Sequence, residues 1–256
     1  RVNILRYPMT KTQSTDSTDK ETAYGAWPSD ISSEQLTAKT VRLGEPCLDN
    51  GNRYWLEQRP EEQGRCVVVC QPADLEQARI DITPPSMNVR SKAHEYGGGS
   101  YCIQDNVIYF VNASDQRVYS MPFDVSATQT EREAQTPQVL SPENSAQVNY
   151  RYADLYIDTH RQQLIAVCEI HRGGETINNG ETAKEPENTI ISLRLDGSST
   201  IGFNVLVFGN DFYSNPSISP DNEKLAWLTW NHPDMPWDNS ECWIADFTHA
   251  GMLNKH

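Results

Sequence analysis

The most restrictive feature of this sequence is a repeated order of short, strand-like segments. One segment type occurs four times, at intervals of about 55 residues, and each copy follows a polar turn. Aligned on Tyr54, Ile108, Leu164 and Leu225, the copies read NRYWLEQ, NVIYFVN, QQLIAVCE and EKLAWLTW. Apolar β-formers bounded by Asn, Asp and Gly are typical of β-strands. The repeat therefore indicates one β-rich unit that is used four times.

Each copy also has the same neighbours. A strand such as YCIQDN or SISPDNE precedes it, a third strand such as RCVVVC follows, and, where the chain continues, a fourth such as ARIDIT comes next. Asp105-Asn106 and Asp221-Asn222 suit the tight hairpins that this order needs. Four short strands in each repeating unit predict an all-β fold, a β-propeller with about four blades visible. A β-sandwich with evenly spaced strands is the alternative, but it does not explain the repeated order.

The units define the expected domain organisation. Residues 1–23 contain a polar Ser/Thr/Asp/Lys tract and are predicted to be disordered. Residues 24–256 form the propeller region, in which the fourth unit lacks an outer strand because the sequence stops at GMLNKH. An incomplete blade leaves an unpaired sheet edge, so we expect these blades to be part of a larger, about seven-bladed propeller. The expected blades are residues 41–83, 95–141, 150–209 and 211–253.

The stretch RSKAHEYGGGSYC raises the question of what three consecutive glycines do. A phosphate loop needs a helix after its glycines, but here a strand-like segment follows. We therefore expect Gly97–Gly99 to begin the innermost strand of a blade, where backbones approach closely around the central channel. Asp154, in the RYAD segment that opens the third unit, is expected to be a turn residue or an inter-blade hydrogen-bond acceptor.

Two segments supply candidate substrate-binding residues at the channel mouth. The first is the approach to the glycines, and the second is the proline-containing loop WNHPDMPWDNSECW. Structural alternatives exist for both: an Arg90–Glu95 ion pair with His94 bonded to a turn, and a rigid proline-packed turn. The candidates are Arg90, His94, Glu95, Tyr96, His232, Trp237 and Asp238.

Charge and motifs exclude several functions. The formal net charge of −14 disfavours binding to nucleic acid or to anionic membranes, and no apolar run approaches the ~20 residues of a membrane span. The sequence has no G-x-S-x-G nucleophile elbow, no H-E-x-x-H and no C-x-x-C pair. We therefore expect no catalytic residues, no metal site and no cofactor. Most of the six cysteines lie in apolar runs, which favours a reducing, cytoplasmic location.

Several segments resemble the N-terminal β-propeller of the prolyl oligopeptidase family of serine peptidases. The most specific are HEYGGG and NHPDMPWD, and the nearest branch is that of dipeptidyl aminopeptidase- and acylaminoacyl peptidase-like proteins. In that family a propeller of about seven blades caps an α/β-hydrolase domain, which carries the catalytic Ser, Asp and His. The resemblance covers residues 24–247, and the hydrolase domain is absent from this chain. It thus implies a full-length serine peptidase of which this chain alone is inactive.

The resemblance implies a substrate-gating, non-catalytic domain that admits short peptides. Its partners would be a peptide substrate and its own C-terminal hydrolase domain, with neither nucleic acid nor membrane; a homo-oligomer is left open. An acidic channel, with the charge of Glu95 or Asp238, would favour a free amino terminus. A free-standing propeller that scaffolds protein partners is the main alternative. A propeller glycosidase would need paired carboxylates, which the sequence does not establish.

Overall fold

The structure is a computed structural model that describes residues 31–32, 40–173, 185–248 and 253–254. Two compact units divide the chain, Arg1–Lys39 and Thr40–His256, and every strand described lies in the second. The predicted disordered segment 1–23 lies outside the described residues. No helix in the described part of the chain is long and apolar enough to cross a membrane.

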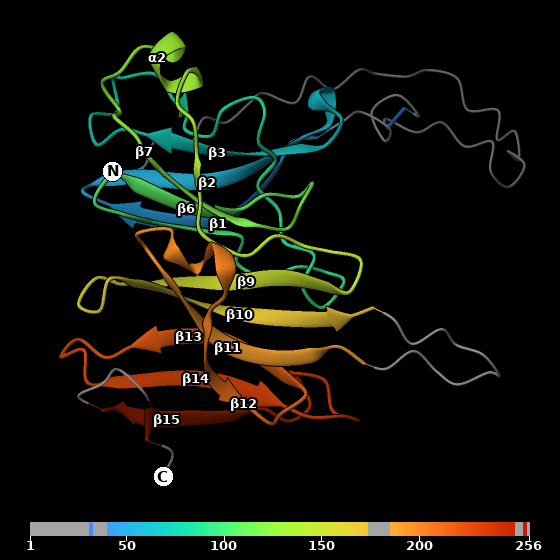
Figure 1. Cartoon of the computed structure of the whole chain (residues 1–256). Coiled ribbons are helices and arrows are strands. Elements are labelled where there is room, and N and C mark those ends of the chain that lie inside the picture. Colours follow the sequence, from blue (N-terminus) through green and yellow to red (C-terminus); the bar gives the residue numbers. More distant parts are fainter. Residues whose placement is uncertain (1–30, 33–39, 174–184, 249–252, 255–256) are drawn as a thin grey trace, which may run out of the picture. The chain divides into compact units, whose positions relative to one another are not determined.

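The second unit contains four antiparallel sheets of four strands each, and each sheet uses its strands in chain order (Figure 1). This arrangement confirms the prediction of an all-β propeller with four blades. In blades 1 and 2 the strands are β1 (Arg42–Asp49), β2 (Asn52–Arg59), β3 (Arg65–Gln71), β4 (Ile80–Asp81), β5 (Tyr101–Gln104), β6 (Val107–Val111), β7 (Val118–Pro122) and β8 (Gln138–Val139). In blades 3 and 4 they are β9 (Val148–Asp158), β10 (Gln163–Arg172), β11 (Glu187–Arg194), β12 (Asn204–Phe208), β13 (Phe212–Ile218), β14 (Lys224–Trp230), β15 (Glu241–Phe247) and β16 (Leu253–Asn254).

One expectation about the fourth blade is wrong. We expected this blade to lack an outer strand, but β16 pairs antiparallel with β15, with Asp246 opposite Asn254 and Phe247 opposite Leu253. The sequence signal was weak because β16 has only two residues. A two-residue strand shows no period-2 pattern.

Helices are few and short in the part of the chain that the structure describes. They are the 3-10 helices η1 (Pro60–Glu62) and η2 (Ser198–Ile201) and the α-helix α2 (Gln129–Glu133). A capping box stabilises α2: the Thr128 hydroxyl accepts the Glu131 N–H, and the Glu131 carboxylate accepts the Thr128 N–H at 2.8 Å. All three helices lie in connections between strands.

Three apolar cores lie between consecutive blades. The strand β10 shows how one strand serves two of them, because neighbouring side chains on a strand point to opposite faces. Leu164, Ala166 and Cys168 join the core shared with blade 2, whereas Ile165 and Val167 join the core shared with blade 4. A third core unites blades 1 and 2 around Tyr54, Val68, Ile108 and Phe110. Burial on both faces explains why these strands are apolar throughout.

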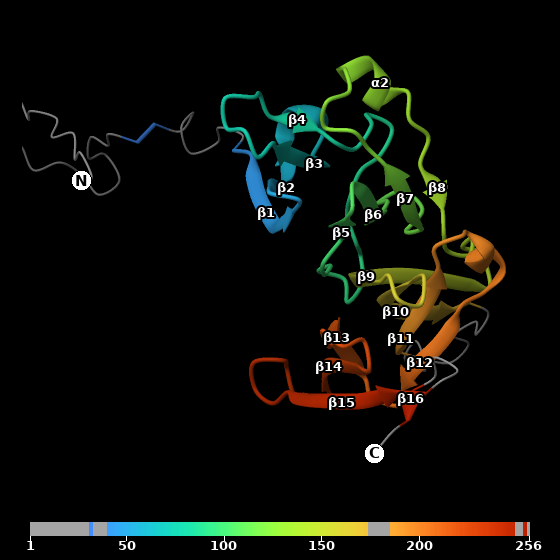
Figure 2. The same ribbon diagram turned by 90° about the vertical axis from the view of Figure 1, so that its left-hand side faces the viewer.

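The inner strands carry a repeated β-bulge. In β1 the pairing with β2 shifts register between Gly44 and Cys47, and in β13 the pairing with β14 shifts between Ser214 and Ser217. In β9 the shift lies between Ala153 and Tyr156, opposite Val167 and Ile165 of β10. Each bulge contains one residue with positive φ, namely Glu45, Asp154 and Asn215. These residues lie on β1, β9 and β13, which follow the concave side of the blades in Figure 2. A bulge re-aims its side chains, so the carboxylates of Glu45 and Asp154 reach the next blade.

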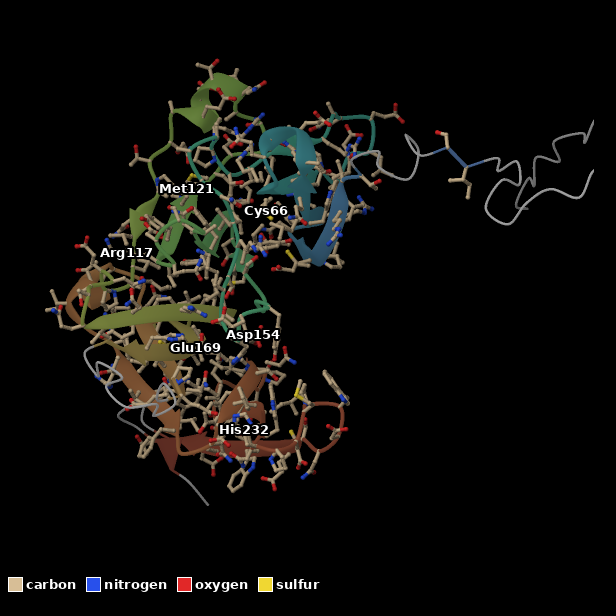
Figure 3. All side chains as sticks on the ribbon, turned by 90° about the vertical axis from the view of Figure 1, so that its right-hand side faces the viewer. Cys66, Arg117, Met121, Asp154, Glu169 and His232 are labelled. Atoms are coloured by element: carbon tan, nitrogen blue, oxygen red, sulfur yellow. The ribbon has the colours of Figure 1, made fainter. Side chains whose placement is uncertain are left out.

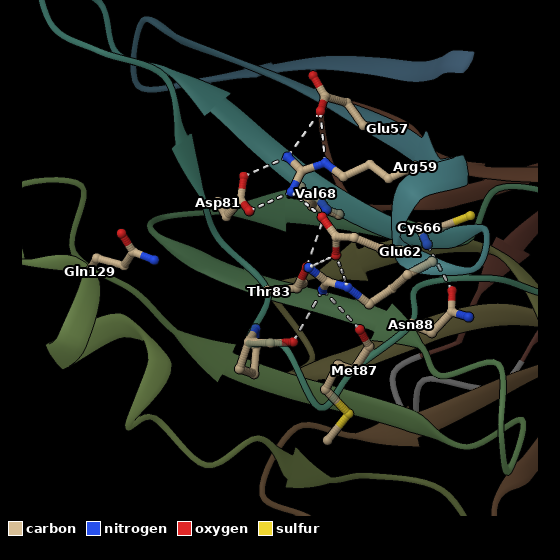
Figure 4. Close-up of polar contacts among 12 residues, drawn as sticks. Glu57, Arg59, Glu62, Cys66, Val68, Asp81, Thr83, Met87, Asn88 and Gln129 are labelled. Carbon is tan, nitrogen blue, oxygen red and sulfur yellow. Dashed lines mark hydrogen bonds and ion pairs between the residues drawn. The ribbon is translucent and has the colours of Figure 1, made fainter. Parts of the chain in front are cut away.

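Polar side chains hold the short outer strand of blade 1 (Figure 4). Two guanidinium nitrogens of Arg59 donate to the two Asp81 oxygens, each at 2.7 Å, and Arg59 also bonds Glu57. Beyond β4, the Val68 N–H donates to the Thr83 hydroxyl at 3.2 Å. These bonds extend a ladder that would otherwise end after two residues.

The structure shows what the three consecutive glycines, Gly97–Gly99, do. They precede β5, which begins at Tyr101, rather than forming its first residues. A Cβ built on Gly98 would lie 2.8 Å from the Ala153 Cβ, and one on Gly99 would lie 3.4 Å from the Asp154 Cα. The backbones themselves are in contact, because the Asp154 N–H donates to Gly99 O at 2.7 Å. The expected close approach of backbones is therefore confirmed, and it occurs against β9 of the next blade.

Candidate functional site

A cavity of about 770 Å³ lies at the edge of blades 3 and 4 where β10 and β14 end. Its size is within the range of small-ligand sites. Its walls come from five segments, the residues preceding β5, the end of β10, the start of β11, the β12–β13 connection and the end of β14 with the loop that follows. Figure 3 labels Glu169 and His232, two of the lining residues, on blades 3 and 4.

The segment before β5 enters this cavity through an unusual turn. His94 and Glu95 both have positive φ, 53° and 64°, and Gly97 follows with 92°. The turn is closed by hydrogen bonds from Gly97 N–H to Ala93 O at 2.8 Å and from Glu95 N–H to Lys92 O at 3.1 Å. Left-handed conformations of non-glycine residues are uncommon and often occur at functional sites. This turn places His94, Glu95 and Tyr96 in the cavity wall.

Aromatic rings form one side of the cavity. Phe212 and Trp230 stack with ring centroids 5.4 Å apart. The ring of His232 meets Phe212 edge-on at 4.9 Å, and the ring of His94 meets it edge-on at 5.5 Å. We call these four residues the aromatic cluster. Its rings come from three separate segments, so the packing of blade 4 against the loop that precedes β5 assembles it.

Charged side chains form a connected chain on another side. Arg151 Nη1 donates to Glu95 Oε1 at 2.6 Å and lies 3.5 Å from Glu169 Oε2. His171 Nε2 lies 2.9 Å from the same Glu169 oxygen. Glu169 is only 3% exposed, and a buried carboxylate needs a cationic neighbour such as Arg151. Across the cavity, His232 Nε2 lies 3.0 Å from Glu185 Oε2.

The protonation states of two residues follow from their surroundings. Burial lowers the pKa of His94 below its ordinary value, although the negative charges of Glu169 and Asp154 oppose this shift. Its Nδ1 is buried and has no hydrogen-bond partner among the described residues. The hydrogen bond from Arg151 lowers the pKa of Glu95. At neutral pH the cavity therefore presents a neutral His94 ring beside a charged Glu95 carboxylate.

The structure brings some of the predicted residues together and separates others. His94, Glu95, Tyr96 and His232 line the large cavity. Arg90 lines a smaller cavity of about 290 Å³, which Tyr96 also lines.

Two of the predicted residues line neither of these cavities, although they belong to the same loop as His232. Trp237 is 75% exposed, and the Asp238 carboxylate accepts the Met235 N–H at 3.1 Å within the loop. Asp238 is thus engaged in a local turn, as the structural alternative for this loop supposed.

The ion pair between Arg90 and Glu95 that the sequence offered as a structural alternative does not form. Glu95 pairs with Arg151, not with Arg90. The expected inter-blade role of Asp154 is confirmed, since its carboxylate accepts the N–H groups of Gly99 at 2.7 Å and of Asn215 at 2.9 Å.

Sequence reasoning missed Phe212, Trp230, Glu169 and His171. The first two stand at the ends of expected strands, where aromatic residues are common, and no local signal distinguishes them. His171 and Glu169 are two apart on β10 and share a face; that spacing was a usable signal.

The lining chemistry favours a cationic, partly apolar ligand. Carboxylates of Glu95, Glu169 and Glu185 line the cavity together with the faces of Phe212 and Trp230. Carboxylates bind ammonium groups through charge-assisted hydrogen bonds, and aromatic faces attract cations. In the described part of the chain, no group of three or more His, Cys, Asp or Glu side chains is placed to hold a metal ion.

Comparison with known proteins places the chain among peptidase structures. No family model and no curated protein matches it. A puromycin-hydrolysing peptidase from Mycobacterium tuberculosis is 29% identical, with a TM-score of 0.73. Puromycin hydrolase is 26% identical with a TM-score of 0.74, and a mutant of it complexed with PGG is 26% identical with a TM-score of 0.75.

Each match covers 90% of this chain and 34% of the peptidase. The chain therefore spans about a third of the length of these proteins. The part that it matches is their propeller domain, and these peptidases are of the prolyl oligopeptidase family. The resemblance to the propeller of this family is thus confirmed, and the branch within the family stays a prediction.

Proposed function

We propose that this chain is the substrate-gating propeller domain of a serine peptidase that hydrolyses short peptides. The observation that carries the proposal is the large cavity, which joins an aromatic cluster to carboxylates in a chain similar to the propeller of puromycin-hydrolysing peptidases. Hydrolysis would be performed by a C-terminal α/β-hydrolase domain, which is the first partner that we propose. The chain itself would be inactive.

The gating role follows from size and rigidity. A cavity of about 770 Å³ accommodates a short peptide but not a folded domain. The walls are held by buried cores between the blades and by inter-blade hydrogen bonds, so the cavity is largely preformed. A preformed site binds with little loss of conformational entropy. The propeller would thus select peptides by size before they reach a nucleophile.

The carboxylates would determine which end of the proposed peptide binds in the cavity. Oε1 of Glu95 accepts from Arg151, and its side chain is largely exposed at 79%. This leaves the carboxylate accessible to the amino terminus of a peptide, while the aromatic cluster would contact its first side chain. The neighbouring Glu169 and Glu185 strengthen the negative potential at the same place. The complex of puromycin hydrolase with PGG supports a peptide ligand.

The binding part of this proposal is tested by calorimetry on the chain. We would titrate it with the tripeptide Phe-Gly-Gly and with N-acetyl-Phe-Gly-Gly. The expected result is binding of the free tripeptide and at least about tenfold weaker binding of the acetylated one, because acetylation removes the ammonium charge. Absence of binding by both peptides would count against the proposal and favour the free-standing scaffold.

The catalytic part is tested on the natural protein. Its mass should be well above that of 256 residues, and a fluorophosphonate serine probe should label it but not the chain alone. Stoichiometric labelling of the chain would refute its non-catalytic role. The cytoplasmic location stays a prediction from the sequence.

A further inference from the structure

A second cavity, of about 290 Å³, lies at the junction of blades 1 and 2. Arg42, at the start of β1, and Arg90, in the connection between the blades, both line it. The Arg90 backbone is fixed, because its N–H donates to Val111 O at 3.0 Å and its carbonyl accepts from Gln116 Nε2 at 3.1 Å. Two guanidinium groups thus share one small cavity in a chain of net charge −14.

The charges of these arginines are not neutralised within the described residues. Neither Arg42 nor Arg90 forms an ion pair there, in contrast to Arg59, Arg65 and Arg151. One carboxylate, that of Glu45, lines the same cavity. Its oxygens accept the Ser100 N–H at 2.7 Å and the Ser100 hydroxyl at 2.9 Å, and burial raises its pKa. Glu45 is therefore engaged with blade 2 and leaves the arginines available for an external anion.

Tyr96 connects the two cavities, because it lines both. One cavity carries carboxylates and aromatic faces, and the other carries two arginines. The carboxylates on one side of Tyr96 and the arginines on the other match the two ends of a short peptide. Such a peptide is positive at its amino terminus and negative at its carboxyl terminus. Guanidinium groups suit this second role, since their planar N–H donors match the geometry of a carboxylate.

We propose that Arg42 and Arg90 form a subsite for the C-terminal carboxylate of a peptide whose amino terminus occupies the large cavity. This inference rests on the proposed function and adds to it a preference for peptides that are free at both ends. A chain with this subsite discriminates against internal segments of longer polypeptides, because such segments have no terminal carboxylate to pair with Arg42 and Arg90. Selection would therefore act on peptide length as well as on bulk.

The test compares Phe-Gly-Gly with its C-terminal amide in calorimetric titrations of the chain. Removal of the carboxylate charge should weaken binding about tenfold. Arg90→Ala and Arg42→Ala should each weaken binding of the acid and leave binding of the amide unchanged, so that the preference falls. Arg90→Lys keeps the charge and should retain part of the preference. Arg53→Ala is the control, because Arg53 is an exposed residue of β2 that lines neither cavity.

The outcomes separate this inference from the proposed function. Equal binding of acid and amide by the unmodified chain would overturn the subsite, and the proposed function would stand. The subsite would also be overturned if the arginine variants, with unchanged unfolding midpoints, weakened both ligands equally. Binding of neither peptide would overturn both proposals.

Discussion

Asp154 and Gly99 exchange two hydrogen bonds across the boundary between blades 2 and 3. The Gly99 N–H donates to Asp154 Oδ1 at 2.7 Å, and the Asp154 N–H donates to Gly99 O at 2.7 Å. The second carboxylate oxygen of Asp154 accepts the Asn215 N–H at 2.9 Å, which adds blade 4 to the same link. One bulge residue therefore connects three blades near the wall of the proposed peptide site.

Removal of this carboxylate should destabilise the fold. In Asp154→Ala the backbone N–H groups of Gly99 and Asn215 lose their acceptor, and a charge-assisted hydrogen bond contributes about 1.5–3 kcal/mol. We expect the free energy of unfolding to fall by about 3 kcal/mol, measured by urea denaturation. Asp124→Ala is the control, because Asp124 is exposed and its carboxylate accepts the N–H and hydroxyl of Ser126 within its own turn. Equal losses in both variants would contradict the inter-blade role.

The glycine at position 98 should not tolerate a side chain. A Cβ there would lie 2.8 Å from the Ala153 Cβ and 3.0 Å from the Asp154 Oδ1, whereas one on Gly44 would meet nothing within 4 Å. Overpacking of this kind costs about 1–3 kcal/mol. We therefore expect Gly98→Ala, but not Gly44→Ala, to lower the thermal unfolding midpoint. An unchanged midpoint for Gly98→Ala would show that β9 can move away without loss.

The partly buried ring of His94 should make stability depend on pH. The unfolded chain binds a proton at His94 near the ordinary pKa of about 6.5, while the folded chain binds it only at lower pH because burial lowers this pKa. Stability is therefore complete above pH 6.5 and falls as the pH decreases toward the folded pKa, by at most about 1.4 kcal/mol per pH unit. His94→Asn, which suits the left-handed backbone, should remove this part of the slope.

The measurement is the free energy of unfolding at several values between pH 5 and pH 7.5, compared between the variant and the unmodified chain. His160→Gln serves as the control, because His160 is exposed. If both variants keep the slope of the unmodified chain, another group is responsible for it.

The carboxylate of Glu95 should distinguish peptides by their amino terminus. In the complete peptidase that we propose, Glu95→Gln should raise KM for peptides with a free amino terminus by about three- to tenfold and leave KM for blocked peptides unchanged. The ion pair between Arg151 and the buried Glu169 would keep the site assembled. Glu76→Gln, a change at an exposed residue outside the cavity, should alter neither value. Equal increases for both peptide types would remove Glu95 from this role.

The sequence by itself determined the blades. The period-2 pattern of each strand, the order of the strands and the Asp-Asn turns are local properties, so they could be read before any coordinates. They also predicted the role of the glycines and of Asp154, because crowding near a propeller axis is a general consequence of the fold. Residues 94–96 and His232 were proposed because their segments are unusual in composition, and the structure places them in the wall of one cavity; their role in binding stays a prediction.

Only the tertiary structure decided which side chains meet. The pairing of Glu95 with Arg151 and the contact of His94 with Phe212 and Trp230 join segments from different blades. These contacts depend on how far each inner-strand bulge turns its side chains and on how neighbouring sheets pack. Neither the bulge nor the packing angle changes the period-2 pattern enough to be recognised in the sequence. A bulge inserts only one residue into a strand, and the angle between two sheets changes no residue at all.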